Sequence, residues 1–310
     1  MLRTLGLLAT IAITACGSTQ KRAAVAHPGK AAPSSLRICK AGDLTDCRGQ
    51  CDRGEISSCL YLSDLYARGD KARKADPQAA TQAAKRGRQL AQARCAANDG
   101  AACAASAQLK LMAIGDKQDF AGAAADAQRG CDAGSTMACF TLAALHQHGK
   151  GVAKNVARAL RLYRQACQAG EGNACAQLGS MAATGDGVAK DRERALALWT
   201  KACKTGVANA CAKVGTVYAQ KNKPAEAMSY SAVACKAGSG RGCTNLGAMY
   251  LLGSGTKQDV KIGLQLTYRG CQLGDRVACQ RLASLAAKAK AMEQDKGKSK
   301  AKKRRRRRRG

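Results

Sequence analysis

The sequence predicts an all-α protein, an α/α solenoid of about seven helix-pair repeats, and three observations lead to this fold class. The cysteines recur in couples of fixed spacing, the segments between them have helical apolar periodicity, and glycines follow at a constant offset. The composition agrees with it. Aromatic residues are only 3% of the chain, whereas a single large core normally contains more large side chains.

The cysteines give the period of the repeat. Apart from Cys16, they form couples whose two members are always 8 positions apart. From Cys95 onward, successive couples begin 36, 36, 36, 32 and 36 residues apart, and a fixed period of this size indicates a repeat array. The couples are Cys39/Cys47, Cys51/Cys59, Cys95/Cys103, Cys131/Cys139, Cys167/Cys175, Cys203/Cys211, Cys235/Cys243 and Cys271/Cys279.

The unit that begins at Asn155 shows how a helix is specified. Asn155 is a favourable N-cap, and from Val156 onward apolar residues follow at i, i+3 and i+4 spacing. This pattern predicts an amphipathic helix with Cys167 in its last turn. Gly170 comes just beyond, where a left-handed residue commonly ends a helix.

A second helix of the same unit is predicted over 173–183. The glycine-rich loop 185–188 follows it and leads to Asp191, the next predicted N-cap. The same kind of loop recurs at 149–152 and 253–256. Each unit is therefore expected to contain two helices and one loop to the next unit.

An even set of cysteines in an exported protein predicts a disulfide framework, and a bond within a couple requires the chain to reverse between its two cysteines. Residues eight apart in a continuous helix are separated by roughly 12 Å of rise, beyond the Cα separation of about 7 Å that a disulfide can span. The pairing of the first four cysteines stays open, because Cys39–Cys51 and Cys47–Cys59 would also close short loops. Glycines that permit the reversal stand three residues after the first cysteine of a couple: Gly54, Gly134, Gly170, Gly206, Gly238 and Gly274.

These features resemble the Sel1-like repeat family, a relative of the tetratricopeptide arrays. The resemblance rests on Leu178-Gly179, the loop 185–188 and Asp191, and again on Leu246-Gly247 and 253–255. The regular cysteine couples resemble the stapled subset known as Helicobacter cysteine-rich proteins. This likeness covers about residues 38–287, the predicted repeat solenoid, and implies β-lactam binding or slow β-lactam hydrolysis as an alternative function.

The N-terminus resembles a bacterial lipoprotein signal. Arg3 precedes an apolar run from Leu5 to Ile13, and a small-residue cleavage site ends at Cys16. We therefore expect a signal peptide over 1–15, lipidation of Cys16 and a flexible tether over 16–37. Lipidation would explain the odd number of cysteines. Gly17 and Ser18 follow Cys16 where an acidic residue could stand, and by resemblance this predicts an outer-membrane lipoprotein that faces the periplasm or the cell surface. The alternative is plain secretion with Cys16 an ordinary residue.

The C-terminal segment 288–310 is predicted to be a disordered basic tail. It carries 13 basic and 2 acidic residues, so it contributes 13 − 2 = 11 of the formal net charge of +31. Such a charge favours anionic partners, here an envelope polymer or lipid, with nucleic acid as an alternative and a purely solubilising tail as another. The residues expected to bind anions are Lys302, Lys303, Arg304, Arg305, Arg306, Arg307, Arg308 and Arg309.

The sequence predicts no catalytic residues, metal site or cofactor. Ser254-Gly255-Thr256-Lys257 and Lys204-Thr205-Gly206 resemble serine β-lactamase motifs, but the repeat already explains both positions and no Ser-Asp-Asn partner is present. His146 and His148 are expected to be surface or loop-capping residues, and the cysteine spacing lacks a zinc signature. The preferred interpretation is a non-catalytic scaffold whose concave solenoid face binds a protein or peptide ligand.

Overall fold

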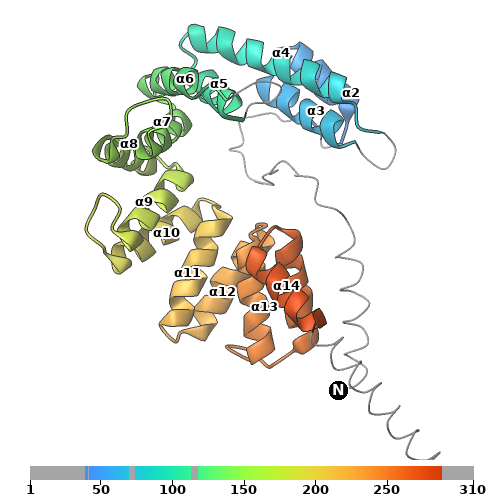
Figure 1. The fold of residues 1–310 in the computed structure, drawn as a ribbon, viewed down its shortest axis with the longest axis vertical. Coiled ribbons are helices and arrows are strands. Elements are labelled where there is room, and N and C mark those ends of the chain that lie inside the picture. Colours follow the sequence, from blue (N-terminus) through green and yellow to red (C-terminus); the bar gives the residue numbers. More distant parts are fainter. Residues whose placement is uncertain (1–38, 41, 70–73, 113–117, 288–310) are drawn as a thin grey trace, which may run out of the picture. The chain divides into compact units, whose positions relative to one another are not determined.

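The computed structural model describes residues 39–40, 42–69, 74–112 and 118–287. Throughout these residues the regular secondary structure is helical, and none of them lies in a β-strand. Figure 1 labels the helices in chain order. Most of them have 13 residues. Their bounds are α2 Leu44–Asp52, α3 Ile56–Arg68, α4 Pro77–Ala96, α5 Gly100–Met112, α6 Phe120–Asp132, α7 Thr136–His148, α8 Val156–Gln168, α9 Gly172–Thr184, α10 Arg192–Lys204, α11 Ala208–Gln220, α12 Pro224–Lys236, α13 Gly240–Leu252 and α14 Val260–Gln272, and a further helical segment is described over 276–287.

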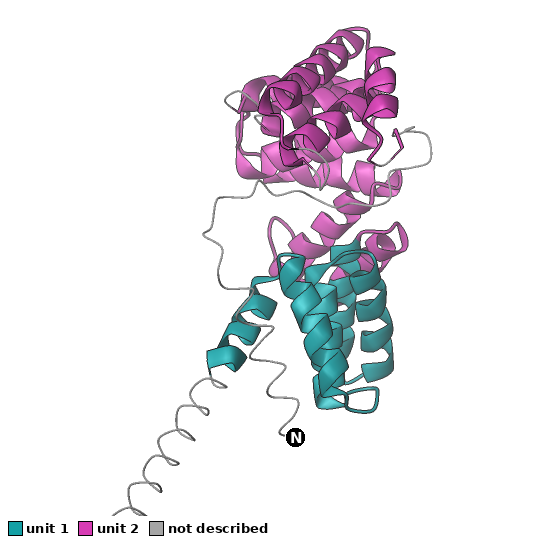
Figure 2. Cartoon of the chain, turned by 90° about the vertical axis from the view of Figure 1, so that its right-hand side faces the viewer, with its two compact units in different colours: residues 1–30, 208–310 teal, residues 31–207 magenta. Residues whose placement is uncertain are grey.

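The described chain divides into two compact units, residues 39–207 and residues 208–287 (Figure 2). In the first unit each helix from α2 to α10 packs against the next one along the chain, and α5 also contacts α7. In the second unit α11 to α14 pack in the same order, and α11 also contacts α13. Contacts restricted to near neighbours are typical of a solenoid, so the predicted fold class is confirmed.

The helix ends follow the predicted cap chemistry. The side chain of Asn155 accepts a hydrogen bond of 2.8 Å from the backbone N–H of Arg158. Asp191 caps α10 in the same way, and Asp259 caps α14. At the other end of α8, Gly170 has a φ of +96°, a left-handed conformation that glycine adopts without steric cost. The second helix of this unit, α9, extends one residue further at each end than the predicted 173–183.

Disulfides between residues eight apart staple the helix pairs, as the fold prediction requires. The first four cysteines pair as Cys39–Cys47 and Cys51–Cys59. Cys203 and Cys211 are also disulfide-bonded. Disulfides persist in oxidising compartments, so this set is typical of an extracytoplasmic protein. The other staples are Cys95–Cys103, Cys131–Cys139, Cys167–Cys175, Cys235–Cys243 and Cys271–Cys279.

The irregular spacings have local causes. The 32-residue interval reflects a short loop, because α11 ends at Gln220 and α12 already begins at Pro224. Asn222 turns this loop with a φ of +55°. After Cys95, where the other repeats have a glycine, Asn98 adopts a φ of +61°. Asparagine is the residue that most readily replaces glycine in this conformation.

The core consists largely of alanine, with few large side chains between the helices. Tyr163 and Leu142 are among the largest fully buried side chains. Trp199 packs against Gly179, where an added Cβ would lie 2.6 Å from the indole ring. The indole N–H of Trp199 also donates a hydrogen bond of 3.2 Å to the carbonyl of Ala176. The glycine of the Leu-Gly step is thus required for the close approach of α10 to α9.

Candidate functional site

A pocket of about 230 Å³ lies between α8 and α10, with α9 contributing to its lining. It belongs wholly to the unit of residues 39–207. Its apolar lining comes from Leu160, Cys167, Leu178, Ala182, Val188 and Leu198, and its polar lining from Arg164, Gln168, Arg194 and Lys201.

Helical spacing brings the polar residues to this pocket. Arg164 and Gln168 are one turn apart on α8, and Arg194 and Lys201 are two turns apart on α10. Residues at these spacings lie on one face of a helix. The pocket is therefore lined by the facing stripes of two helices that hold equivalent places in consecutive repeats.

Three cations line the pocket without a carboxylate among the lining residues. Arg164, Arg194 and Lys201 are exposed, whereas Leu160 and Leu178 are buried beneath. None of these three cations forms an ion pair within the described ranges. An apolar cavity surrounded by unbalanced positive charge can hold an apolar group that is attached to an anion.

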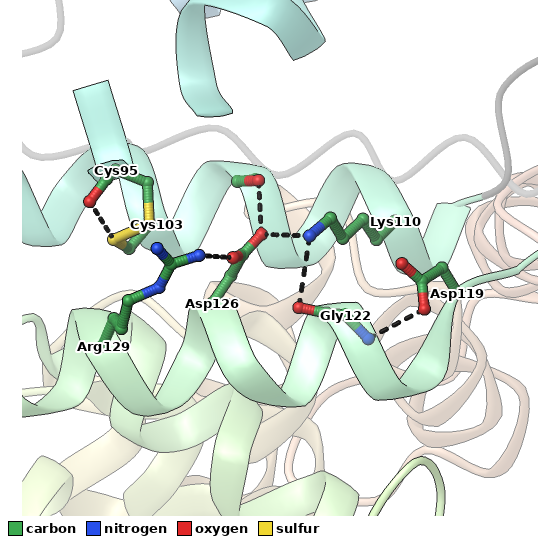
Figure 3. Close-up of polar contacts among 8 residues, drawn as sticks. Cys95, Cys103, Lys110, Asp119, Gly122, Asp126 and Arg129 are labelled. Atoms are coloured by element: carbon green, nitrogen blue, oxygen red, sulfur yellow. Dashed lines mark hydrogen bonds and ion pairs between the residues drawn. A yellow bond between two sulfur atoms is a disulfide. The ribbon is translucent and has the colours of Figure 1, made fainter. Parts of the chain in front are cut away.

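The most deeply buried charge in the described residues belongs to Asp126, at the junction of α5 and α6 (Figure 3). Its carboxylate accepts a hydrogen bond of 2.6 Å from the hydroxyl of Ser106 and lies 2.7 Å from the ammonium of Lys110. The guanidinium of Arg129 is 2.5 Å away. Burial raises the pKa of Asp126, but the hydrogen bonds from Lys110, Ser106 and Arg129 outweigh it and the pKa is lowered. Since the carboxylate is fully partnered, we interpret this group as a structural one.

A second buried polar cluster joins α7, α8 and α9. The phenol of Tyr163 donates a hydrogen bond of 3.0 Å to the side-chain carbonyl of Gln147. The amide nitrogen of Gln147 donates at 2.8 Å to Asp186, and Gln177 donates to Gln147 at 3.1 Å. Burial, with a smaller effect of the Asp186 charge, raises the pKa of Tyr163. This phenol remains protonated and serves as a donor that connects adjacent repeats.

None of the residues of the β-lactamase-like motifs is among the residues that line the pocket. Ser254 is in the loop after α13, where its backbone N–H donates to the carbonyl of Met249 at 3.0 Å. Thr205 follows α10 and its hydroxyl donates back to Ala202 at 2.8 Å. His146 is buried and its Nδ1 lies 3.2 Å from the carbonyl of Ala153, in the following loop, while His148 is exposed. The predicted loop-capping role thus fits His146.

The predicted signal peptide, lipidated Cys16, tether and basic tail lie outside the described residues. Among the residues that are described, no three His, Cys, Asp or Glu side chains are grouped as a metal site would require. Likewise, none of the helices in that part of the chain has the length and apolarity needed to cross a membrane.

The pocket cations were missed by the sequence reasoning. The repeat period contains a signal for them. Arg164 stands 36 residues after Gln128, where a neutral residue becomes a cation, and Arg194 stands 36 residues after Arg158, where the cation is kept. A comparison of equivalent positions would have shown a gain of charge on one helix face at this repeat.

Comparisons with known proteins agree with the helical repeats. The Sel1 repeat matches residues 56–82, 136–171, 172–207 and 240–275. The search of curated proteins found no match. Among solved structures, a Sel1 repeat protein from Oxalobacter formigenes has a TM-score of 0.58 at 22% identity, covering 78% of this chain and 79% of its own.

Two further solved structures are similar to parts of the chain. The protective antigen c5321 of uropathogenic Escherichia coli, which has an SLR fold, gives a TM-score of 0.53 at 22% identity. That match covers 78% of this chain but only 51% of the antigen, so the chain spans about half of that protein. The cysteine rich protein B of Helicobacter pylori is 25% identical over 42% of this chain and 94% of its own, with a TM-score of 0.34. The structures from Oxalobacter formigenes and Escherichia coli show the fold that this chain shares with them.

Proposed function

The chain carries Sel1 repeats, which generally mediate protein–protein interactions, and we propose that it is an exported, lipid-anchored scaffold that binds protein partners. In this proposal the ligand is a protein or peptide that lies along the solenoid face to which α8 and α10 contribute. Cys16 carries the lipid anchor, which holds the scaffold at the outer membrane. The repeats supply the binding surface and the staples preserve it outside the cytoplasm.

The pocket between α8 and α10 is the observation that carries the proposal. Protein-binding sites combine an apolar centre with a polar rim, and the buried Leu160 and Leu178 beneath Arg164 and Arg194 provide both. The buried carboxylate of Asp126 in the same unit is held by Ser106, Lys110 and Arg129, so it is not available as a reactive group. Binding therefore fits this surface better than catalysis does.

We further propose that the basic tail, with Lys302, Lys303 and Arg304 to Arg309, binds an anionic envelope polymer or lipid. Its contribution of 13 − 2 = 11 positive charges in 23 residues (288–310) supports this proposal. Association through such a segment is electrostatic, depends on salt and requires no fixed tail structure. The tail would then bring the scaffold to a surface, and the repeats would select the protein partner.

The experiment is a cross-linking pull-down from intact envelopes with the full chain and with a chain that lacks residues 296–310. We expect both forms to capture the same protein partners, while only the full chain retains anionic polymer or lipid in low salt. Capture of no protein by either form would contradict the scaffold function. Retention of polymer by the truncated chain would contradict the role of the tail, and recovery of DNA alone would assign the tail to nucleic acid.

A further inference from the structure

Hydrogen bonds join α8 to α6 at the place equivalent to the pocket, one repeat earlier. Arg158 on α8 donates a hydrogen bond of 2.6 Å to the side-chain carbonyl of Gln128 on α6. The amide nitrogen of Gln128 donates in turn to the carboxylate of Asp132 at 2.8 Å. A guanidinium, an amide and a carboxylate thus form one chain of hydrogen bonds across the two helices, with the arginine charge balanced within the protein.

One repeat further along, the same positions carry a different set of side chains. Arg194 stands 36 residues after Arg158, but Gln128 is replaced by Arg164 and Asp132 by Gln168. Two guanidinium groups cannot bond to each other, because both are donors and both are positive. The carboxylate that ends the chain of hydrogen bonds in the preceding repeat has no counterpart on α8. The pocket lies at this place, lined by both arginines and by Gln168.

A third substitution increases the positive charge. Lys201 on α10 occupies the position that Gln165 holds on α8, again 36 residues earlier. From one repeat to the next the helix faces therefore gain two positive charges and lose one negative charge. The helices α6, α8 and α10 are each 13 residues long, so a difference in helix length does not account for this gain of charge.

The apolar lining limits what can enter. A cavity of about 230 Å³ is smaller than the roughly 300–1,000 Å³ of sites that enclose a drug-sized ligand. Leu160, Leu178 and Leu198 line it. Binding at such an apolar surface is favourable when an apolar group of the ligand displaces water from it. A polyphosphate or a sulfated polymer has no apolar side chain to place there, whereas a peptide has.

We infer that this pocket binds an acidic peptide segment, with an apolar side chain in the cavity and a carboxylate held between Arg164 and Arg194. The inference rests on the proposed scaffold function and specifies its ligand. In the preceding repeat the carboxylate of Asp132 accepts from Gln128 at the end of the hydrogen-bond chain. Its equivalent on α8 is the uncharged Gln168, so the ligand supplies the negative charge that this repeat lacks. Lys201, two turns from Arg194 on α10, lies where a second acidic side chain of the same segment can reach it.

The inference can be tested by fluorescence anisotropy with the purified, oxidised full chain. The probe is a short fluorescein-labelled peptide in which one leucine is flanked by glutamates. Two matched peptides serve as controls, one with each glutamate changed to glutamine and one with the leucine changed to alanine. We expect each control peptide to bind about tenfold more weakly or worse, because a charge-assisted hydrogen bond and a buried leucine each contribute on that scale.

Three variants test the pocket from the protein side. Arg164→Gln and Arg194→Gln each remove one cation, and Gln168→Asp supplies an internal carboxylate that competes with the ligand. Each is expected to weaken binding of the glutamate peptide about tenfold. Arg161→Gln removes an exposed charge of α8 that does not line the pocket, and should change the affinity by less than about twofold.

Arg164→Gln also distinguishes a loss of peptide binding from a loss of protein stability. It recreates the Gln128–Arg158 arrangement of the preceding repeat, so the thermal midpoint should stay or rise while binding is lost. Unchanged affinity in both arginine variants would refute the inference, as would equal binding of the leucine and alanine peptides. Arg164-dependent binding of polyphosphate that displaces the peptide would refute the peptide class. If envelope proteins are still captured in any of these cases, the scaffold function stands and only the pocket assignment fails.

Discussion

The ammonium of Lys110 on α5 lies 2.7 Å from the carboxylate of Asp126 on α6, and only 2% of the Asp126 side chain is exposed. This ion pair crosses the interface between two repeats, in a core that otherwise consists mainly of alanine and cystine. A buried charge destabilises a fold unless its partners are retained. The pair therefore ties α5 and α6 together in one register.

We expect Asp126→Asn to lower the free energy of unfolding by about 1.5–3 kcal/mol. The amide keeps the shape of the carboxylate but leaves Lys110 and Arg129 without their anion. Chemical denaturation followed by circular dichroism measures the change. Asp64→Asn is the matched control, because Asp64 pairs with Arg68 at 2.7 Å on the surface. Such exposed pairs contribute at most about 1 kcal/mol, and equal effects of the two substitutions would contradict the structural role of Asp126.

The stabilisation from Asp126 should depend on pH. Its pKa is lowered in the folded protein, so folding favours the ionised carboxylate over the protonated one. The contribution is complete above the unfolded pKa, about 3.9, and is lost as the pH falls through the lower folded pKa. Thermal melts of the wild type and of Asp126→Asn should differ at pH 7 and converge in acid. A difference that stayed constant down to pH 2 would show that the charge of Asp126 is not its source.

The sequence predicted the features that depend on local chemistry. Cap residues such as Asn155 and Asp191 hydrogen-bond within their own first turn, and Gly170 adopts its conformation for reasons of backbone sterics. The cysteine period predicted the staples for a related reason, because each one closes a short loop. These features require no knowledge of which helix packs on which.

The sequence did not predict features that depend on pairing between repeats. Asp126 stands in the middle of α6, and nothing in its local sequence marks it as buried. Its partners Ser106 and Lys110 lie 20 and 16 residues away on α5. The pocket was missed for the same reason, since Arg164 and Arg194 meet only when α8 and α10 are placed side by side as pocket walls.

Removal of one staple should cost a defined amount of stability. Changing both Cys167 and Cys175 to alanine opens a short loop, and the chain-entropy estimate gives a loss of about 2.5 kcal/mol. Chemical denaturation in the absence of reductant measures it. Treating the wild type with a phosphine reductant should lower its thermal midpoint further, since the remaining staples are also opened. A double variant as stable as the wild type under oxidising conditions would show that the Cys167–Cys175 bond contributes nothing.

Replacing a glycine at a chain reversal by alanine should lower the stability, whereas replacing a glycine inside a helix should raise it. Gly170 has a φ of +96° and open space around an added Cβ, so Gly170→Ala meets no clash and its cost, about 1 kcal/mol, is that of the left-handed backbone alone. Gly49 lies inside α2, where an added Cβ would come no nearer than 3.4 Å, to the flexible end of Arg53. Gly49→Ala should therefore stabilise the protein by about 0.5–1 kcal/mol, because alanine loses less backbone entropy in a helix. Denaturation of both variants under oxidising conditions measures the two effects, and stabilisation by Gly170→Ala would mean that the reversal does not require a left-handed residue.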